Sequence, residues 1–197
     1  MSSHHIVRDA QEPALVIASM SVTYDQLGQL LEWSPVVVVL ENCLEHLLSL
    51  EIKVDKIICQ AIHYQSILEK SEHQQPLQIF PLESKEVIDF LHFAIQNLIE
   101  NGHDAISIIG EDFNPSIFKK YIQKAELIVY QENRKSYFVK KGVFKKWVIA
   151  SSIFYFPEID KISNISGLEE ITPQQWRAAQ TGLISFEAKE TVFLSEN

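Results

Sequence analysis

The chain has 197 residues, of which 46% are hydrophobic and 22% are charged, so it is large enough for one mid-sized domain or two small ones and too apolar to be largely disordered. Its formal net charge of −9 argues against nucleic acid as a primary partner, because DNA and RNA binders neutralise phosphates with a basic surface. No apolar run reaches the roughly 20 residues that a membrane-spanning helix needs, and the first residues show no secretory signal. We therefore expect a cytoplasmic protein without a membrane partner.

The charge is divided unevenly along the chain. Residues 1–118 hold 17 acidic and 5 basic residues, whereas residues 119–197 hold 9 acidic and 12 basic residues. The basic residues cluster between positions 119 and 146. Such a cluster is typical of a solvated face, and it is also compatible with an anion-attracting surface beside a ligand cleft.

The first half of the chain alternates short apolar runs with segments of helical spacing. Continuous apolar runs of this length indicate buried strands, and a helix between consecutive strands favours a parallel sheet covered on both faces. The predicted strands are 14–18, 36–40, 54–58, 77–80 and 105–109, and the predicted helices before residue 84 are 24–33 and 43–50.

The strongest helical pattern covers residues 85–101. Seven apolar residues follow the 3.6-residue period, Ser84 is a plausible N-cap, and Gly102 is a plausible stop. A further helix is predicted over 116–124, after the strand that ends before Gly110.

From about residue 125 the pattern changes to short β-branched and aromatic runs separated by turn residues. Seven such runs, with no long helix between them, favour a β-sandwich, although residues 173–179 are compatible with one or two helical turns. The predicted fold class is therefore α/β: a parallel-sheet α/β domain over residues 1–124, followed by an all-β sandwich over residues 125–197.

In an open α/β sheet, ligands bind beyond the carboxyl ends of the strands. Four segments follow predicted strands there, namely 41–43, 59–63, 83–89 and 110–115. The third is the most distinctive, since Glu86 and Asp89 lie three residues apart at a helix start and are able to hold Mg²⁺, with Lys85 beside them to contact a phosphate. Acidic residues in a first helical turn also stabilise the helix dipole without any metal.

The other three segments carry weaker signals. Glu41 is either a third carboxylate or the polar end of a strand, His63 and Tyr64 are able to line a pocket, and Gly110 is able to begin a turn. Walker-type, G-x-G-x-x-G, G-x-S-x-G and H-E-x-x-H patterns are absent from the sequence. The two cysteines, Cys43 and Cys59, lack metal-type spacing and are predicted to be buried, reduced thiols.

The order of these segments resembles the thiamine pyrophosphokinase family over nearly the whole chain. Four short segments in the first half of the chain carry the resemblance, together with Gly167-Leu168 and Ser185-Phe186-Glu187, which are similar to a G-L pair and an S-N element near the family's C-terminus. The segment ENCL at 41–44 is similar to the family's first acidic motif, and CQAIH at 59–63 stands where the family has G-D-x-D-S. KEVID at 85–89 is similar to K-D-x-T-D, and GEDFN at 110–114 stands where a Gly-rich segment leads to R-x-D-H. The carboxylate pair of the second motif and the Arg and His of the fourth are therefore missing.

The resemblance implies an N-terminal α/β domain, a C-terminal β-sandwich and a homodimer that binds thiamine between opposing subunits. It implies transfer of pyrophosphate from ATP to thiamine with Mg²⁺, giving thiamine diphosphate and AMP. Under it, Glu86 and Asp89 carry the metal and Lys85 contacts phosphate. The further cofactor-binding residues that it implies are Glu41, Gly110, Asp112, Trp176 and Ser185.

The eroded motifs leave two other functions open. Without the carboxylate pair and the Arg, charge on the phosphates is poorly stabilised, which favours an inactive dimeric relative that binds a thiamine-like or nucleotide ligand. A different transferase on the same scaffold, using His63, Tyr64 or Asp112, is the third possibility, because a fold alone does not define an activity.

Overall fold

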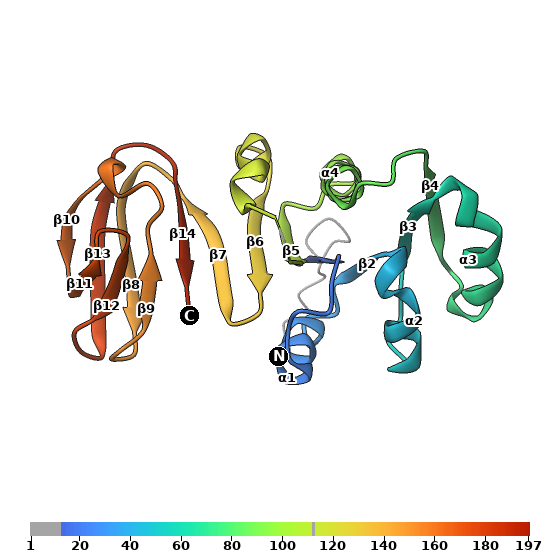
Figure 1. The fold of residues 1–197 in the computed structure, drawn as a ribbon, viewed down its shortest axis with the longest axis horizontal. Helices are drawn as coiled ribbons and strands as arrows, with labels where there is room; N and C mark the ends of the chain where they lie inside the picture. The colour runs from blue at the N-terminus through green and yellow to red at the C-terminus, as the bar shows by residue number, and fades with distance from the viewer. Residues whose placement is uncertain (1–12, 112) are drawn as a thin grey trace, which may run out of the picture. The chain divides into compact units, whose positions relative to one another are not determined.

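The computed structural model describes residues 13–111 and 113–197 and divides into two compact units (Figure 1). The first unit contains residues up to 114 together with 120–132, and the second contains 115–119 and 133–197. The predicted division into an α/β domain over 1–124 and a β-sandwich domain over 125–197 stays a prediction. In the described part of the chain, no helix is both long and apolar enough to cross a membrane.

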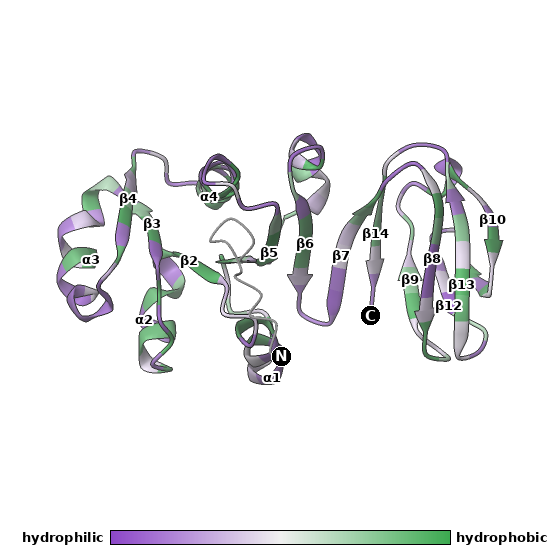
Figure 2. Cartoon of the chain, turned by 180° about the vertical axis from the view of Figure 1, so that it is seen from behind, coloured by the Kyte–Doolittle hydropathy of each residue, from purple (hydrophilic) through white to green (hydrophobic). Residues whose placement is uncertain are grey.

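The first unit is built on a parallel sheet with the strand order β6-β5-β1-β2-β3-β4. Its strands coincide with apolar runs because they are buried on both faces; β2, for example, is hydrophobic along its length (Figure 2). The strands are β1 (Ala14–Ile17), β2 (Val36–Leu40), β3 (Lys56–Gln60), β4 (Gln78–Leu82), β5 (Ala105–Ile109) and β6 (Glu126–Gln131).

Helices cover both faces of this sheet (Figure 1). One face packs against α1, α2 and α3 through a core that includes Leu27, Leu44 and Ile67, and α4 contacts β1, β2 and β3. The helices are α1 (Tyr24–Leu31), α2 (Glu41–Ser49), α3 (Tyr64–Lys70) and α4 (Val87–Glu100), and the 3-10 turns are η2 (Ala61–His63), η3 (Glu72–Gln74) and η4 (Pro115–Tyr121).

Several predicted helix limits were wrong. Helix α2 begins at Glu41 and not at residue 43, helix α4 begins at Val87 with Glu86 as its N-cap residue, and the predicted helix 116–124 is the 3-10 turn η4. Helix α3 was not predicted, because only Ile67 of its seven residues is buried and no apolar period marks it.

The second unit is a sandwich of antiparallel sheets, which confirms the predicted fold class. One sheet has the order β11-β12-β9-β14-β7 and the other β10-β13-β8. Both contribute to one core, in which Phe154 and Leu194 of the first sheet meet Phe186 and Ile184 of the second. The strands are β7 (Arg134–Val139), β8 (Gly142–Val148), β9 (Ile153–Tyr155), β10 (Ile162–Ser166), β11 (Leu168–Thr172), β12 (Gln175–Ala178), β13 (Gly182–Ala188) and β14 (Val192–Glu196), with the turn η5 at Ile159–Lys161.

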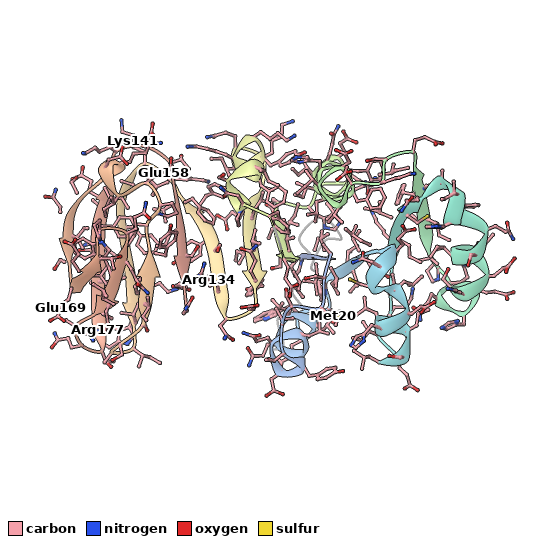
Figure 3. The ribbon with its side chains drawn as sticks, in the orientation of Figure 1. Met20, Arg134, Lys141, Glu158, Glu169 and Arg177 are labelled. Atoms are coloured by element: carbon pink, nitrogen blue, oxygen red, sulfur yellow. The ribbon has the colours of Figure 1, made fainter. Side chains whose placement is uncertain are left out.

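The segment 173–179, which the sequence leaves open to a helical turn, forms strand instead. Strand β12 pairs with β11 on one side and β9 on the other, and Glu169 and Arg177 form an ion pair of 3.3 Å across the β11–β12 hairpin (Figure 3). Pairing with neighbours on both sides outweighs the weak local preference of this segment.

Candidate functional site

The carboxyl edge of the parallel sheet, where β1, β2, β3, β4 and β5 end, is the candidate site. The chain runs outward from β1 to β4 and then returns to β5 on the other side of β1, so the strand order reverses between β1 and β5. In open α/β sheets such a reversal opens the crevice that binds ligands. The segments 18–23, 41–43, 61–63, 83–86 and 110–114 follow these strands.

The best-defined polar cluster at this edge surrounds the carboxylate of Glu41. This side chain is 14% exposed at the first position of α2. Its Oε2 accepts hydrogen bonds from the backbone N–H of Gln60 and from His63 Nδ1, both at 3.0 Å, and its Oε1 accepts from Gln60 Nε2 at 3.1 Å. The cluster thus joins the ends of β2 and β3 through three donors on one carboxylate.

A second group of polar side chains lies around the end of β1. Asn42 donates from Nδ2 to the carbonyl of Ala18 at 2.9 Å, which ties the start of α2 to the loop after β1. In the described part of the chain, the hydroxyls of Ser19 and Ser21 are buried without a hydrogen-bond partner. Buried polar groups of proteins are nearly always satisfied, so these hydroxyls mark a place where a bound polar group would find donors.

Gly110 lies where β5 ends and is closely packed. A Cβ atom there would come within 2.4 Å of Phe113 Cε1, so the residue at this position has no room for a side chain. The backbone N–H of Gly110 donates to the carbonyl of Tyr130 at 3.1 Å. The predicted cofactor-binding residue Asp112 lies outside the described residues.

The three residues predicted to hold metal and phosphate lie at the start of α4. Lys85, Glu86 and Asp89 are all exposed. The hydroxyl of Ser84 donates to the Asp89 carboxylate and accepts from the backbone N–H of Glu86 at 3.1 Å. The Ser84 hydroxyl thus links the loop to the first turn of α4, whose N-cap residue Glu86 makes no side-chain capping hydrogen bond. The roles of Lys85, Glu86 and Asp89 in metal and phosphate binding stay predictions.

The residues that follow β2 and β3 do not fit a Mg²⁺ ion. Mg²⁺ prefers carboxylate, phosphate and water oxygens, but both oxygens of Glu41 are already used by N–H donors. Metal-bound carboxylates are commonly hydrogen-bonded as well, so the stronger obstacle is that residues 59–63 supply no second acid beside Glu41. Among residues 13–111 and 113–197, no three His, Cys, Asp or Glu side chains are grouped to hold a metal.

Both cysteines are free and buried, as predicted. Burial and the nearby Glu111 raise the pKa of the Cys43 thiol to about 11, and burial and Glu41 raise the pKa of Cys59 to about 11. Both thiols therefore stay protonated near neutral pH, which makes them poor nucleophiles and poor metal ligands.

The two residues predicted to contact thiamine lie in the second unit on different surfaces. Trp176 packs against the sandwich core, and its buried Nε1 has no hydrogen-bond partner in the described part of the chain. Ser185 alternates with the buried Ile184 and Phe186 on β13, so it faces away from that core. The structure does not bring the two side chains to one face of the sandwich.

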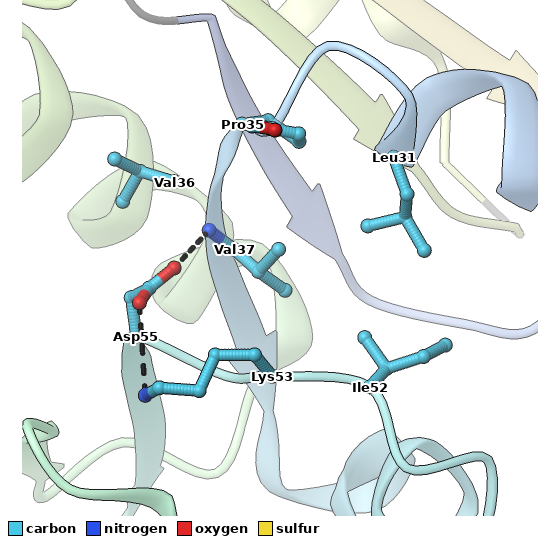
Figure 4. A pocket seen from close by; sticks show the side chains of 8 residues that line it. Leu31, Pro35, Val36, Val37, Ile52, Lys53 and Asp55 are labelled. Atoms are coloured by element: carbon cyan, nitrogen blue, oxygen red, sulfur yellow. Dashed lines mark hydrogen bonds and ion pairs between the residues drawn. The ribbon is translucent and has the colours of Figure 1, made fainter.

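A pocket of about 450 Å³ lies at the opposite, amino edge of the parallel sheet (Figure 4). Its charged residues serve the backbone: Asp55 accepts from the N–H of Val37 at 2.9 Å, and Lys53 donates to the carbonyls of Val54, Gln74 and Pro76. The remaining lining residues are Leu31, Ser34, Pro35, Val36 and Ile52. The pocket therefore presents an apolar wall to a ligand, and its two charged residues, Lys53 and Asp55, already form an ion pair with each other.

Comparison with known proteins decides the fold. No family model and no curated protein matches the sequence. Among solved structures, thiamine pyrophosphokinase from Bacillus subtilis matches 95% of this chain and 99% of its own, with a TM-score of 0.69 and 12% identity. The Candida albicans enzyme matches 97% of this chain and 94% of its own, with a TM-score of 0.62 and 14% identity. The chain has the thiamine pyrophosphokinase fold.

This likeness extends to the yeast thiamine pyrophosphokinase, which matches 98% of this chain and 87% of its own with a TM-score of 0.64 and 8% identity. The resemblance read from the sequence is thus confirmed for the scaffold. The cluster of Gln60 and His63 on Glu41 was missed, because these residues are 19 and 22 positions from Glu41 and only the β2–β3 pairing brings them together. The one feature of the sequence that pointed to Gln60 and His63 was their position directly after a predicted strand.

Proposed function

We propose that this chain is a thiamine pyrophosphokinase-fold protein that binds a thiamine-like or nucleotide ligand at the carboxyl edge of its parallel sheet without transferring pyrophosphate. The observation that carries this proposal is the Glu41 carboxylate, whose two oxygens are occupied by Gln60 and His63. The buried, unpartnered hydroxyls of Ser19 and Ser21 beside the strand-order reversal support ligand binding at the same edge.

The absence of turnover follows from the chemistry of pyrophosphate transfer. Charge that develops on the phosphates must be stabilised by cations, which are supplied by metal ions and by Arg or Lys side chains. Residues 59–63 carry no acid to hold a metal, and no Arg occurs between positions 9 and 133. A single Lys at 85 is a point charge and does not reproduce a bidentate guanidinium.

The experiment combines binding with a product assay on the full chain. Calorimetry with thiamine, thiamine diphosphate, ATP and AMP, each with and without Mg²⁺, is expected to find binding of one of them. Incubation with ATP, Mg²⁺ and thiamine is expected to give no AMP above a protein-free control. Formation of thiamine diphosphate and AMP at an enzymatic rate would overturn the proposal, and so would the lack of binding by all four compounds.

The second candidate is an ATP- and Mg²⁺-dependent thiamine pyrophosphokinase. It is favoured by Lys85, Glu86 and Asp89, which occupy the start of α4 at the same sheet edge and leave exposed carboxylates for a metal–nucleotide complex. Mg²⁺ is often bound by one or two carboxylates plus substrate phosphates. In this case the product assay is positive, and Asp89→Asn abolishes it while Glu126→Gln, a change at an exposed acid on β6, does not.

We also propose that the protein is a homodimer, and the supporting surface is the outer face of β8 and β13. Trp147 is 68% exposed and lies opposite Leu183, which is 57% exposed. Val143 and Ile149 extend this apolar stripe. Exposed Trp and aliphatic clusters are typical of interfaces, and Lys145 and Glu187 on the same face are able to pair reciprocally across a two-fold axis.

A further inference from the structure

His63 is held in one orientation by Glu41. Its Nδ1 lies 3.0 Å from Glu41 Oε2, and the carboxylate is itself fixed by two further hydrogen bonds from Gln60. The imidazole side chain is 49% exposed, whereas the carboxylate that holds it is 14% exposed. The arrangement places a largely covered orienting carboxylate behind a half-exposed ring.

The identity of the partner determines the tautomer of this ring. An ionised carboxylate accepts hydrogen bonds only, so the ring nitrogen that faces it carries the hydrogen. A neutral imidazole has one N–H, and with the hydrogen on Nδ1 the other nitrogen, Nε2, presents a lone pair. The same carboxylate–imidazole arrangement orients metal-ligating histidines and the proton-accepting histidine of catalytic triads.

The surroundings of His63 indicate the kind of group that reaches Nε2. His63 follows β3 at the sheet edge where ligands of open α/β folds bind. Its chain neighbours Ile62 and Tyr64 are both exposed, and Ile62 is 77% exposed. A ligand that reaches Nε2 therefore needs a hydrogen-bond donor, and two exposed apolar or aromatic side chains adjoin His63 in the chain.

We propose that Glu41 locks His63 in the Nδ1–H tautomer and that His63 Nε2 is the acceptor for a hydroxyl or amino group of the bound ligand, in a contact that needs no metal. Glu41 is the positioning residue, and His63 is the contact residue. The inference rests on the proposed ligand-binding function, and it names the polar group by which the ligand is recognised at that site.

The tautomer is tested without any ligand. In long-range ¹H–¹⁵N spectra at pH 8, where imidazole side chains are ordinarily neutral, we expect His63 to carry its hydrogen on Nδ1. In Glu41→Ala no acceptor faces Nδ1, so the hydrogen is no longer confined to that nitrogen, while the exposed His73 keeps the same spectrum in both proteins. An Nε2–H tautomer in the wild type, or an unchanged His63 spectrum in the variant, would refute the lock.

The contact is tested with thiamine and with its analogue in which hydrogen replaces the hydroxyl, both in the presence of EDTA. We expect His63→Ala to weaken thiamine binding about tenfold, the factor for one hydrogen bond. The analogue should bind wild type and variant alike. His73→Ala, a matched change at another exposed histidine, should bind thiamine as the wild type does.

The outcomes separate the two proposals. If wild type binds thiamine and His63→Ala binds it equally well, the contact is refuted while ligand binding stands. If EDTA abolishes binding to the wild type, the metal-free contact is refuted. If the four compounds of the calorimetry experiment all fail to bind, the proposed function itself falls, and the tautomer spectra still report whether Glu41 orients His63.

Discussion

Gly110 illustrates how a single residue limits the packing at the strand-order reversal. From the sequence, Gly110 is predicted to begin a turn. The structure shows that its lack of a side chain makes room for the Phe113 ring. The requirement is steric and not conformational, because the φ angle of Gly110 is not in the left-handed region that favours glycine.

Gly110→Ala is therefore expected to lower the free energy of unfolding by about 1–3 kcal/mol, the usual cost of forcing extra volume into a packed site. Chemical denaturation measures the change. Gly28→Ala is the matched control, since a Cβ there meets nothing within 4 Å and alanine favours the interior of α1 by about 0.5–1 kcal/mol. Adding Phe113→Ala to Gly110→Ala should restore part of the loss, and equal effects of the two glycine changes would contradict the steric argument.

Glu158 is a carboxylate whose environment makes stability depend on pH (Figure 3). Burial raises its pKa, but hydrogen bonds from Lys161 and from the backbone N–H of Phe193, with the charge of Lys119, outweigh burial and lower the pKa below its usual value. A carboxyl with a lowered folded-state pKa stabilises the fold above its unfolded pKa of about 4.3, and this stabilisation is lost as the pH falls through the folded-state pKa.

We expect Glu158→Gln to lower the free energy of unfolding by about 1.5–3 kcal/mol at pH 7, the range of a hydrogen bond to a charged group. The difference from wild type should shrink as the pH falls from the unfolded-state pKa of about 4.3 through the lowered folded-state pKa, below which the wild-type carboxyl is also neutral. Urea unfolding at several pH values measures it. Glu169→Gln, which removes an exposed ion pair with Arg177, should change stability by less than about 1 kcal/mol at every pH. A Glu158 effect that does not vary with pH would contradict the assignment.

At the scale of elements, the start of α4 shows how local polar contacts define a helix end. The sequence predicts Ser84 as the N-cap, whereas the structure places Glu86 at that position. Ser84 still contributes, because its hydroxyl bridges the backbone N–H of Glu86 and the carboxylate of Asp89. One hydroxyl therefore organises the loop that carries the predicted phosphate and metal residues.

Ser84→Ala is expected to lower the free energy of unfolding by about 0.5–1.5 kcal/mol, the net contribution of a hydrogen bond. Thermal and urea denaturation measure the effect. Ser66→Ala within the exposed surface of α3 is the control and should be neutral or slightly stabilising, because alanine is the better helix former. Equal changes for both serines would show that the Ser84 bridge does not stabilise the helix start.

At the scale of the whole molecule, the apolar stripe on the outer face of β8 and β13 bears on assembly. Along β8 and β13, outward-facing residues alternate with residues that face the sandwich core. The exposed Trp147 and Leu183 therefore do not contribute to that core. A dimer that covers them removes apolar surface from water, which favours association.

Trp147→Glu should convert a dimer into a monomer without unfolding it, since a buried charge opposes association and the residue is exposed in the single chain. Sedimentation velocity measures the mass, and circular dichroism checks the fold. Tyr24→Glu, at an exposed aromatic residue of the first unit, is the control and should leave the dimer intact. A wild-type monomer, or a variant that stays dimeric, would exclude this face as the interface.

Much of the scaffold is readable from the sequence because strands buried on both faces must be continuously apolar. The apolar run at 36–40 predicts a strand, and the 3.6-residue apolar period of α4 predicts a helix, from the local sequence alone. The sequence did not predict the short helix α3 or the β11–β12 hairpin. Their exposed positions are polar, and their conformation depends on partners distant in sequence.

The sequence by itself determined the fold class, most of the strongly apolar elements, and the absence of acids from 59–63 and of Arg from 9–133, because burial patterns and residue identities are properties of the chain. Tertiary structure alone decided that Glu41 meets Gln60 and His63, since this contact depends on how β2 lies against β3. Whether a carboxylate binds a metal or orients another side chain depends on the groups around it, and these groups are brought together only in the folded chain.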